Sequence, residues 1–138
     1  MTDRLSAYES WCDNGRDPYE DHCGPFFMRT LPDGSVTTAF EAVAHHCNGH
    51  GNIHGGALMS FADYSLFAIA RSDLGDDTAV TVTFNSEFIA AGAAGELIEG
   101  RGSVTRTTKR LVFVRGEIFS GSQVFLTFSG VLMKRQRR

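Results

Sequence analysis

The residues from Gly55 to Arg71 read GGALMSFADYSLFAIAR and constrain the fold more than any other part of this chain. Their length, their Ala and Leu content and the absence of proline predict an α-helix. The apolar residues surround the helix axis instead of forming one stripe, which is typical of a helix buried on most sides. Because the apolar surface of such a helix must be buried, the rest of the chain is expected to pack around it.

Two strand-like runs precede this helix, and four follow it. The first two, FFMRTL and VTTAFEAVA, flank the turn sequence Pro32-Asp33-Gly34 and predict a β-hairpin. The four later runs are TAVTVTFNSEFIA, GELIEGRGSVTRT, KRLVFVRGEIFSG and SQVFLTFSGVLMK. Their short connections, such as Gly121-Ser122, favour antiparallel hairpins. This order predicts an α+β fold, in which an antiparallel sheet wraps around one long central helix.

The first of the four later runs alternates between apolar and polar residues, as a strand with one buried face does. The residues predicted to share the apolar face are Val80, Val82, Phe84 and Phe88. The residues predicted to share the opposite face are Thr81, Thr83, Asn85 and Glu87.

The start of the chain is expected to be an extension to this domain. Residues 3 to 12 carry apolar side chains at three-to-four spacing, which predicts a short amphipathic helix. Residues 13 to 25 are rich in Gly, Pro, Asp and Asn, which predicts an ordered loop. We therefore divide the chain into an extension over 1–25, a domain over 26–134 and a basic tail over 135–138.

Composition limits the compartment and the partners. A chain of 138 residues with 42% hydrophobic content supplies one core, and a net charge of -3 lacks the basic excess of nucleic-acid-binding proteins. Three irregularly spaced cysteines argue against a disulfide framework and for a reducing compartment. The N-terminus has no apolar targeting segment, and no window approaches the roughly 18 apolar residues of a membrane span. We expect a soluble cytoplasmic protein with no nucleic-acid or membrane partner.

A cluster of glycine and polar residues stands just before the predicted helix and reads HCNGHGNIHGG from His46 to Gly56. With the aspartate that follows in the helix, it resembles the active-site segment of hotdog-fold acyl-CoA thioesterases of the phenylacetyl-CoA (PaaI) type. The residues that match this pattern are Asn48, Gly51, His54, Gly55, Gly56 and Asp63. The resemblance implies a hotdog fold and hydrolysis of an acyl-CoA or aroyl-CoA thioester to the free acid and CoA, without metal or cofactor.

Asp63 and the start of the helix are the groups best suited to this chemistry. Asp63 carries the only charge between Gly55 and Ala70, and a carboxylate on a buried helix is costly unless it is paired or functional. It is the candidate general base or nucleophile, although an exposed helix edge or an arginine partner would also explain it. Backbone N–H groups at Gly55 and Gly56 can stabilise an oxyanion, although these glycines can equally form a turn into the helix.

The distance between these two groups predicts an oligomer. Asp63 follows Gly55 by eight residues, which is about 12 Å along a helix axis. The carboxylate therefore cannot serve the N-terminus of its own helix. A partner helix that runs antiparallel across a two-fold axis would bring the two groups together, so we predict a homodimer or a dimer of dimers.

The remaining site residues follow from the resemblance. Asn48 would orient the water or the carbonyl, although an asparagine before Gly49 is equally a turn residue. Thr81 stands where the family often has a hydroxyl near the acyl group, although it can also be an ordinary strand threonine. For the CoA portion, the resemblance points to Arg106, Lys109, Arg110 and Gly92.

Other readings of these residues lead to different functions. A metal site is suggested by His45, His46, His50 and His54, with Cys47 among them, but their spacing fits no common zinc motif. A hydratase would need an Asp and His pair at another spacing. A non-catalytic module that binds acyl-CoA is the main alternative, and the presence of Asp63 and Asn48 argues against it. Aromatic residues on the helix either line an acyl pocket or form core: Phe61, Tyr64 and Phe67.

Overall fold

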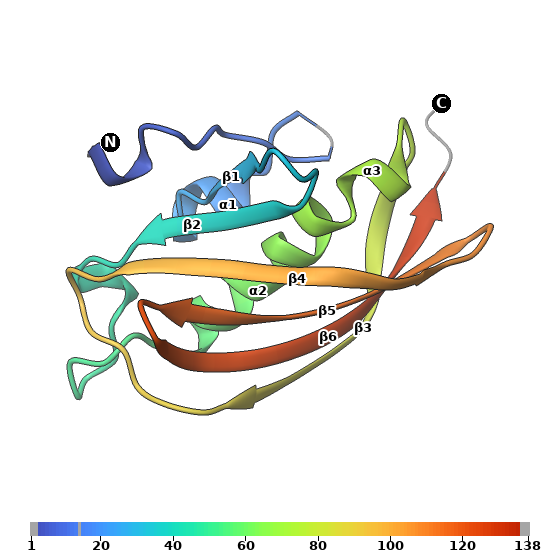
Figure 1. The fold of residues 1–138 in the computed structure, drawn as a ribbon. Helices are drawn as coiled ribbons and strands as arrows, with labels where there is room; N and C mark the ends of the chain where they lie inside the picture. The colour runs from blue at the N-terminus through green and yellow to red at the C-terminus, as the bar shows by residue number, and fades with distance from the viewer. Residues whose placement is uncertain (1–2, 14, 136–138) are drawn as a thin grey trace.

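The computed structural model describes residues 3–13 and 15–135, and one antiparallel sheet of six strands dominates it (Figure 1). The strands are β1 (Phe27–Thr30), β2 (Val36–Glu41), β3 (Thr78–Phe88), β4 (Leu97–Thr107), β5 (Leu111–Ser120) and β6 (Gln123–Arg135). Their order across the sheet is β1-β2-β4-β5-β6-β3. The helical elements are η1 (Asp3–Leu5), α1 (Pro18–Cys23), η2 (Ala44–His46), α2 (Gly55–Ile69) and α3 (Arg71–Leu74).

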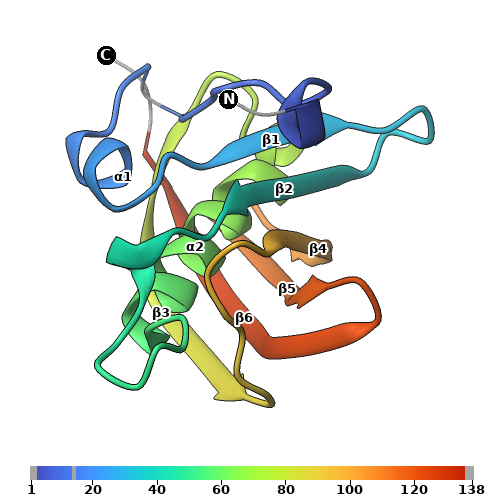
Figure 2. The same cartoon turned by 90° about the vertical axis from the view of Figure 1, so that its left-hand side faces the viewer.

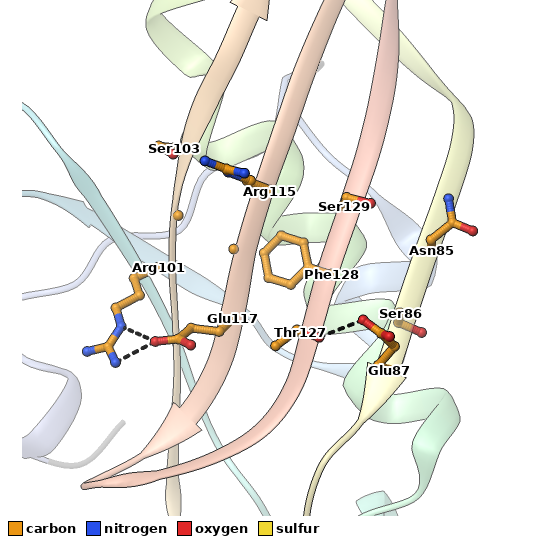
Figure 3. Close-up of a pocket in the computed structure, with 12 residues that line it drawn as sticks. Asn85, Ser86, Glu87, Arg101, Ser103, Arg115, Glu117, Thr127, Phe128 and Ser129 are labelled. Carbon is orange, nitrogen blue, oxygen red and sulfur yellow. Dashed lines mark hydrogen bonds and ion pairs between the residues drawn. The ribbon is translucent and has the colours of Figure 1, made fainter.

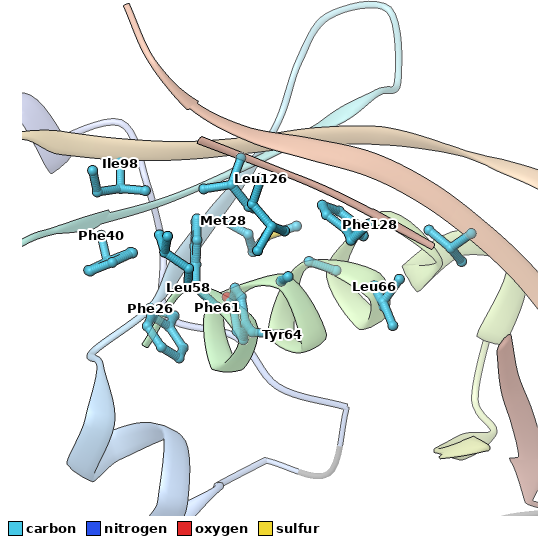
Figure 4. Close-up of a cluster of buried hydrophobic side chains, with 14 of the residues drawn as sticks. Phe26, Met28, Phe40, Leu58, Phe61, Tyr64, Leu66, Ile98, Leu126 and Phe128 are labelled. Atoms are coloured by element: carbon cyan, nitrogen blue, oxygen red, sulfur yellow. The ribbon is translucent and has the colours of Figure 1, made fainter. Parts of the chain in front are cut away.

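The long helix α2 lies across one face of the curved sheet and carries the core (Figures 1 and 4). Phe61 is fully buried, and its ring centroid lies 4.7 Å from that of Phe40 on β2. Tyr64 is 2% exposed, so both aromatic residues belong to the core, and only Phe67 is partly accessible. The predicted α+β hotdog fold is confirmed, because a single helix is packed against an antiparallel sheet.

Small residues let α2 approach the sheet closely. A Cβ atom added at Gly130 of β6 would lie 2.5 Å from Cδ1 of Leu66, and one at Gly100 of β4 would lie 2.3 Å from Oγ1 of Thr38. The Thr38 hydroxyl lies 2.7 Å from that of Ser65, so the two buried hydroxyl groups satisfy each other. These contacts fix the position of α2 on the sheet, and they thereby fix the direction in which its polar side chains point.

The start of the chain folds differently from the prediction. The expected helix over residues 3 to 12 is wrong, because only the short turn η1 is helical. Glu9 instead exchanges two backbone hydrogen bonds with Met28 of β1, at 2.8 and 2.9 Å. Leu5 and Tyr8 are buried in a small cluster with Ala39, so the apolar spacing reflects a segment that packs on the sheet.

The predicted loop over 13–25 contains the helix α1. Asp17 caps it by accepting a hydrogen bond from the backbone N–H of Glu20 at 3.0 Å, and Pro18 occupies its first position. Figure 2 shows this helix beside α2, on the side that the strands leave open. At the other end of the chain, the predicted basic tail begins inside β6, since Arg135 is its last residue, and 136–138 lie outside the described residues.

The predicted faces of β3 are wrong for its first residues, up to Val82, and right from Phe84 onward. The register of β3 against β6 shifts between Thr81 and Thr83, so Val82 forms a bulge and is 48% exposed. Thr81 consequently points to α2, on the same side as Phe84, which packs against the core. A bulge inserts one residue and reverses the alternation after it, which a strict period of two does not anticipate.

Candidate active site

Asp63 projects from the middle of α2 toward β3. The hydroxyl of Thr81 donates a hydrogen bond of 2.6 Å to Oδ1 of Asp63. Burial raises the pKa of Asp63 above its ordinary value, the hydrogen bond from Thr81 opposes this, and the charge of Asp17 adds to it. The result is a half-buried carboxylate held in one orientation, which suits a general base or a nucleophile.

The start of α2 leaves one backbone donor free. The ring Nδ1 of His54, the residue before the helix, accepts a hydrogen bond of 2.8 Å from the N–H of Gly56. The N–H groups of Ala57 and Leu58 both donate to the carbonyl oxygen of His54. Within the described part of the chain, the N–H of Gly55 has no acceptor, so Gly55 rather than Gly56 is the candidate oxyanion donor.

Asn48 shapes the loop that leads to this helix. Its Oδ1 accepts hydrogen bonds from the backbone N–H groups of His50 and Asn52, at 2.9 and 3.2 Å. The side-chain oxygen therefore has the turn-forming role that the sequence left open. The side-chain NH₂ has no acceptor among the described residues, so it can still donate to a substrate.

The histidines near this loop make backbone contacts. His46 is 4% exposed; its Nδ1 accepts from the N–H of Val43 at 3.0 Å, and its Nε2 donates to the carbonyl oxygen of Cys23 at 2.9 Å. Burial lowers the pKa of His46. His46 thus ties the loop to the end of α1, and together with the cap made by His54 this assigns structural contacts to two of the four histidines of the cluster.

The residues predicted to bind CoA lie at two ends of the sheet. Gly92 is buried in the connection between β3 and β4, where an added Cβ would lie 3.0 Å from both Ile53 and Phe125. The basic residues stand at the other end of β4 and in the turn to β5, where they are exposed: Arg106, Lys109 and Arg110. Since the 11 residues of β4 span about 35 Å, one chain does not bring both groups to one ligand (Figure 1).

Two cavities lie beside Asp63, and the start of the chain forms one wall of each. One of about 150 Å³ also contacts Trp11, Asp17 and Glu20. The other, of about 360 Å³, adds Tyr19, Met59, Ser60 and Phe84. Sequence reasoning missed Glu20 as a site residue, although Asp17-Pro18 three residues before it is a strong helix start that marks this segment as ordered.

A further cavity of about 710 Å³ lies on the outer face of the sheet, away from α2 (Figure 3). It contains an ion pair in which Nε of Arg101 donates to Oε1 of Glu117 at 2.8 Å. Its described walls hold none of the residues predicted for the site. The two cavities beside Asp63 are therefore better candidates for the active site than this one.

Comparisons with known proteins identify the family of this chain. Residues 50–126, which include Asp63, His54 and Thr81, match the family model described as the thioesterase superfamily. The chain belongs to the thioesterase superfamily. The predicted resemblance to PaaI-type hotdog thioesterases is thereby confirmed, and the protein is a thioester hydrolase.

Several solved structures are similar to this chain over most of their own length. The protein TT0310 from Thermus thermophilus shares 30% identity and a TM-score of 0.73, covering 87% of this chain and 99% of its own. The N33D mutant of the phenylacetic acid degradation protein PaaI from the same organism shares 28% identity and a TM-score of 0.73, covering 86% and 100%. The conserved protein PA5202 from Pseudomonas aeruginosa shares 26% identity and a TM-score of 0.78, covering 87% and 95%. Among curated proteins, none matches this chain. Within the described residues, no helix is long and apolar enough to cross a membrane.

Proposed function

We propose that this thioesterase hydrolyses an acyl-CoA or aroyl-CoA ester to the free acid and CoA, with Asp63 as its catalytic carboxylate. The observation that carries the proposal is the hydrogen bond of 2.6 Å from Thr81, which holds a half-buried carboxylate at a cavity wall. A raised pKa makes the ionised form of Asp63 a stronger base than an exposed aspartate, which favours removal of a proton from water.

The reaction also needs a donor for the oxygen of the thioester carbonyl. The free N–H of Gly55 supplies it, and the dipole of the helix adds positive potential at the same place. Because Asp63 and Gly55 are about 12 Å apart along one axis, the working site combines Asp63 of one subunit with Gly55 of the other. The NH₂ of Asn48, on the loop that leads to Gly55, is a candidate second donor to the carbonyl.

A two-fold assembly also gives a role to the basic residues in the turn between β4 and β5. Lys109 and Arg110 follow the far end of β4, which is about 35 Å long, whereas Gly92 precedes its start, so they would meet the phosphates of CoA bound in a neighbouring subunit's site. The reaction requires no metal or cofactor in this scheme, because water, Asp63 and a backbone N–H supply all its parts. Activity is therefore expected to survive EDTA.

A panel of short, medium, long and aromatic CoA esters tests the proposal by release of free thiol. The wild-type chain is expected to hydrolyse at least one class, and Asp63→Asn is expected to lower kcat/KM at least about 100-fold on it. A far-ultraviolet circular dichroism spectrum like that of the wild type would show that the variant folds. Tight CoA-ester binding without thiol release by the wild-type chain would instead favour the non-catalytic module.

A further inference from the structure

Glu20 of α1 is a second carboxyl group at the site, and the reaction as proposed leaves it without a role. It lines both cavities that Asp63 lines, of about 150 and 360 Å³. It also lines a third one of about 280 Å³, together with Trp11 and Tyr64. Glu20 therefore faces the space in which a substrate at Asp63 would lie.

The helix that carries Glu20 is fixed at both ends and to α2. Asp17 caps its start, and the N–H of Gly24 donates to the carbonyl oxygen of Glu20 at 2.8 Å. The hydroxyl of Tyr19 lies 2.9 Å from that of Ser60 on α2. These contacts hold the carboxyl of Glu20 against α2 without using it themselves.

The surroundings of Glu20 favour its protonated form. Burial, followed by the charges of Asp17, Asp63, Asp13 and Asp21, raises the pKa of Glu20 to about 8. The arginine of this segment, Arg16, is exposed and pairs with Asp21 at 3.3 Å. Thr81 stabilises the anion of Asp63, whereas no hydrogen bond from the described residues reaches the carboxyl of Glu20. The hydrogen bond from Thr81 thus favours the anion at Asp63, while burial favours the proton at Glu20, which is the pattern that a base and an acid require.

The cavity wall also holds a buried donor that lacks an acceptor. The hydroxyl of Tyr64 is shielded from solvent and has no hydrogen-bond partner in the described part of the chain. Tyr64 stands beside Glu20 in the walls, and the charge of Glu20 contributes to raising the pKa of Tyr64. Buried hydroxyl groups normally have a partner, so this one points to a polar group that occupies the cavity during the reaction.

We propose that Glu20 is the general acid of the hydrolysis and donates its proton to the sulfur of CoA as the C–S bond breaks. This inference rests on the proposed function, with Asp63 as the base. Asp63 takes a proton from water as the water oxygen bonds to the carbonyl carbon, and the C–S electron pair passes to sulfur, which takes the proton of Glu20. The products are the carboxylic acid and the CoA thiol, and a proton then returns from Asp63 to Glu20 through water.

The surroundings explain why such an acid is needed. In water a thiolate is a good leaving group that needs no proton, but here it would form beside the carboxylates of Asp13 and Asp17, which line the same cavity as Glu20. Repulsion in a partly buried site raises the cost of a second anion. A proton donor with a pKa of about 8 is close to the ordinary value of about 8.5 for a thiol, so the transfer is nearly balanced.

Two thioesters of the same acyl group test this role: the CoA ester, and the ester of 4-nitrothiophenol, whose far more acidic thiol needs no proton. Glu20→Gln is expected to lower kcat on the CoA ester about 100-fold and on the nitrothiophenyl ester less than about 3-fold. His22→Gln, at an exposed position of the same helix, is the control, expected to change both rates less than about 2-fold. Equal loss of both activities by Glu20→Gln, or loss of neither, would overturn the proposal.

The wild-type enzyme provides a check that needs no variant to fold. Its kcat on the CoA ester is expected to fall above about pH 8, as Glu20 ionises, while kcat on the nitrothiophenyl ester stays level. Parallel profiles for the two esters would also contradict the proposal. Asp63→Asn tests the role of Asp63 separately. If the proposed function is wrong, this variant stays active on both esters. If only the acid role of Glu20 is wrong, this variant is inactive on both esters.

Discussion

The composite site makes a quantitative prediction about mixed dimers. Two defective chains are needed, one lacking the carboxylate through Asp63→Ala and one lacking the oxyanion donor through Gly55→Val. The second defect follows from the structure, because a Cβ at Gly55 would lie 3.0 Å from Cε1 of Phe88, and the added methyl groups would shield the N–H. Each variant alone is expected to be inactive.

Mixing the two chains restores a predictable share of activity. If equal amounts refold together at random, about half of the dimers contain one chain of each kind. Each such dimer has one site with both defects and one site that pairs the intact Asp63 with the intact Gly55. Independent sites then give about a quarter of the wild-type kcat. This pairing between chains is expected because Asp63 and Gly55 of one chain are about 12 Å apart along the helix axis.

The assay is thiol release after co-refolding, with two differently tagged chains so that mixed dimers can be purified. Asn48→Ala in place of Gly55→Val is a second partner for the same experiment, and it avoids the contact with Phe88. Purified mixed dimers that are as inactive as either parent would refute the reasoning, since both groups would then have to come from one chain. Purification of the chain as a monomer with full activity would refute it as well.

Three further predictions concern Asp63 and Glu20. Thr81→Val removes a hydrogen bond to the anion of Asp63 and so raises the pKa of Asp63. We expect kcat/KM at pH 7 to fall about 10-fold and the acid limb of its pH profile to move to higher pH. The control is Thr83→Val, at an exposed position of the same strand, which should change neither. The pKa of Glu20 is about 8 in the folded chain and about 4.5 in the unfolded chain, so the folded chain binds this proton more tightly and wild-type stability declines as the pH rises from about 4.5 to 8. Glu20→Gln should therefore have a higher Tm than the wild type at pH 8 and a similar Tm at pH 4. The same Tm difference at both pH values would contradict this prediction. A single turnover in ¹⁸O-labelled water with excess enzyme tests whether Asp63 is a nucleophile. Label in the carboxyl group of Asp63, with an unlabelled first-turnover acid, would show a mixed anhydride that water opens at the Asp63 carbon, whereas a general base leaves the label in the acid and none in the protein.

Much of the fold could be predicted because its signals are local. The helix from Gly55 was visible as an apolar run without proline, and its start was marked by His54, which the structure shows capping Gly56. The four strands after it lie within the four predicted runs, except that β6 extends one residue further, to Arg135. Periodicity and caps depend on contacts between residues a few positions apart, so the sequence carries them directly.

Asp63 could also be selected as the candidate carboxylate from sequence alone. A lone charge within an apolar helix is conspicuous whatever surrounds it, because burial of an unpaired charge is costly. What holds this carboxylate was not predictable in the same way. Thr81 was assigned to the wrong face, because the bulge at Val82 depends on how β3 registers with β6, about 50 residues later in the chain.

Tertiary structure alone decided the second carboxyl of the site and the surroundings of both. Glu20 stands 43 residues before Asp63 in the sequence, in a segment whose composition predicts only a loop, and the two meet because α1 docks on α2 through Tyr19 and Ser60. Such a meeting depends on packing between distant elements, and no periodicity within either element encodes it. The pKa of Glu20 is likewise set by burial and by carboxylates from several segments, so the chemistry of this pair exists only in the folded chain.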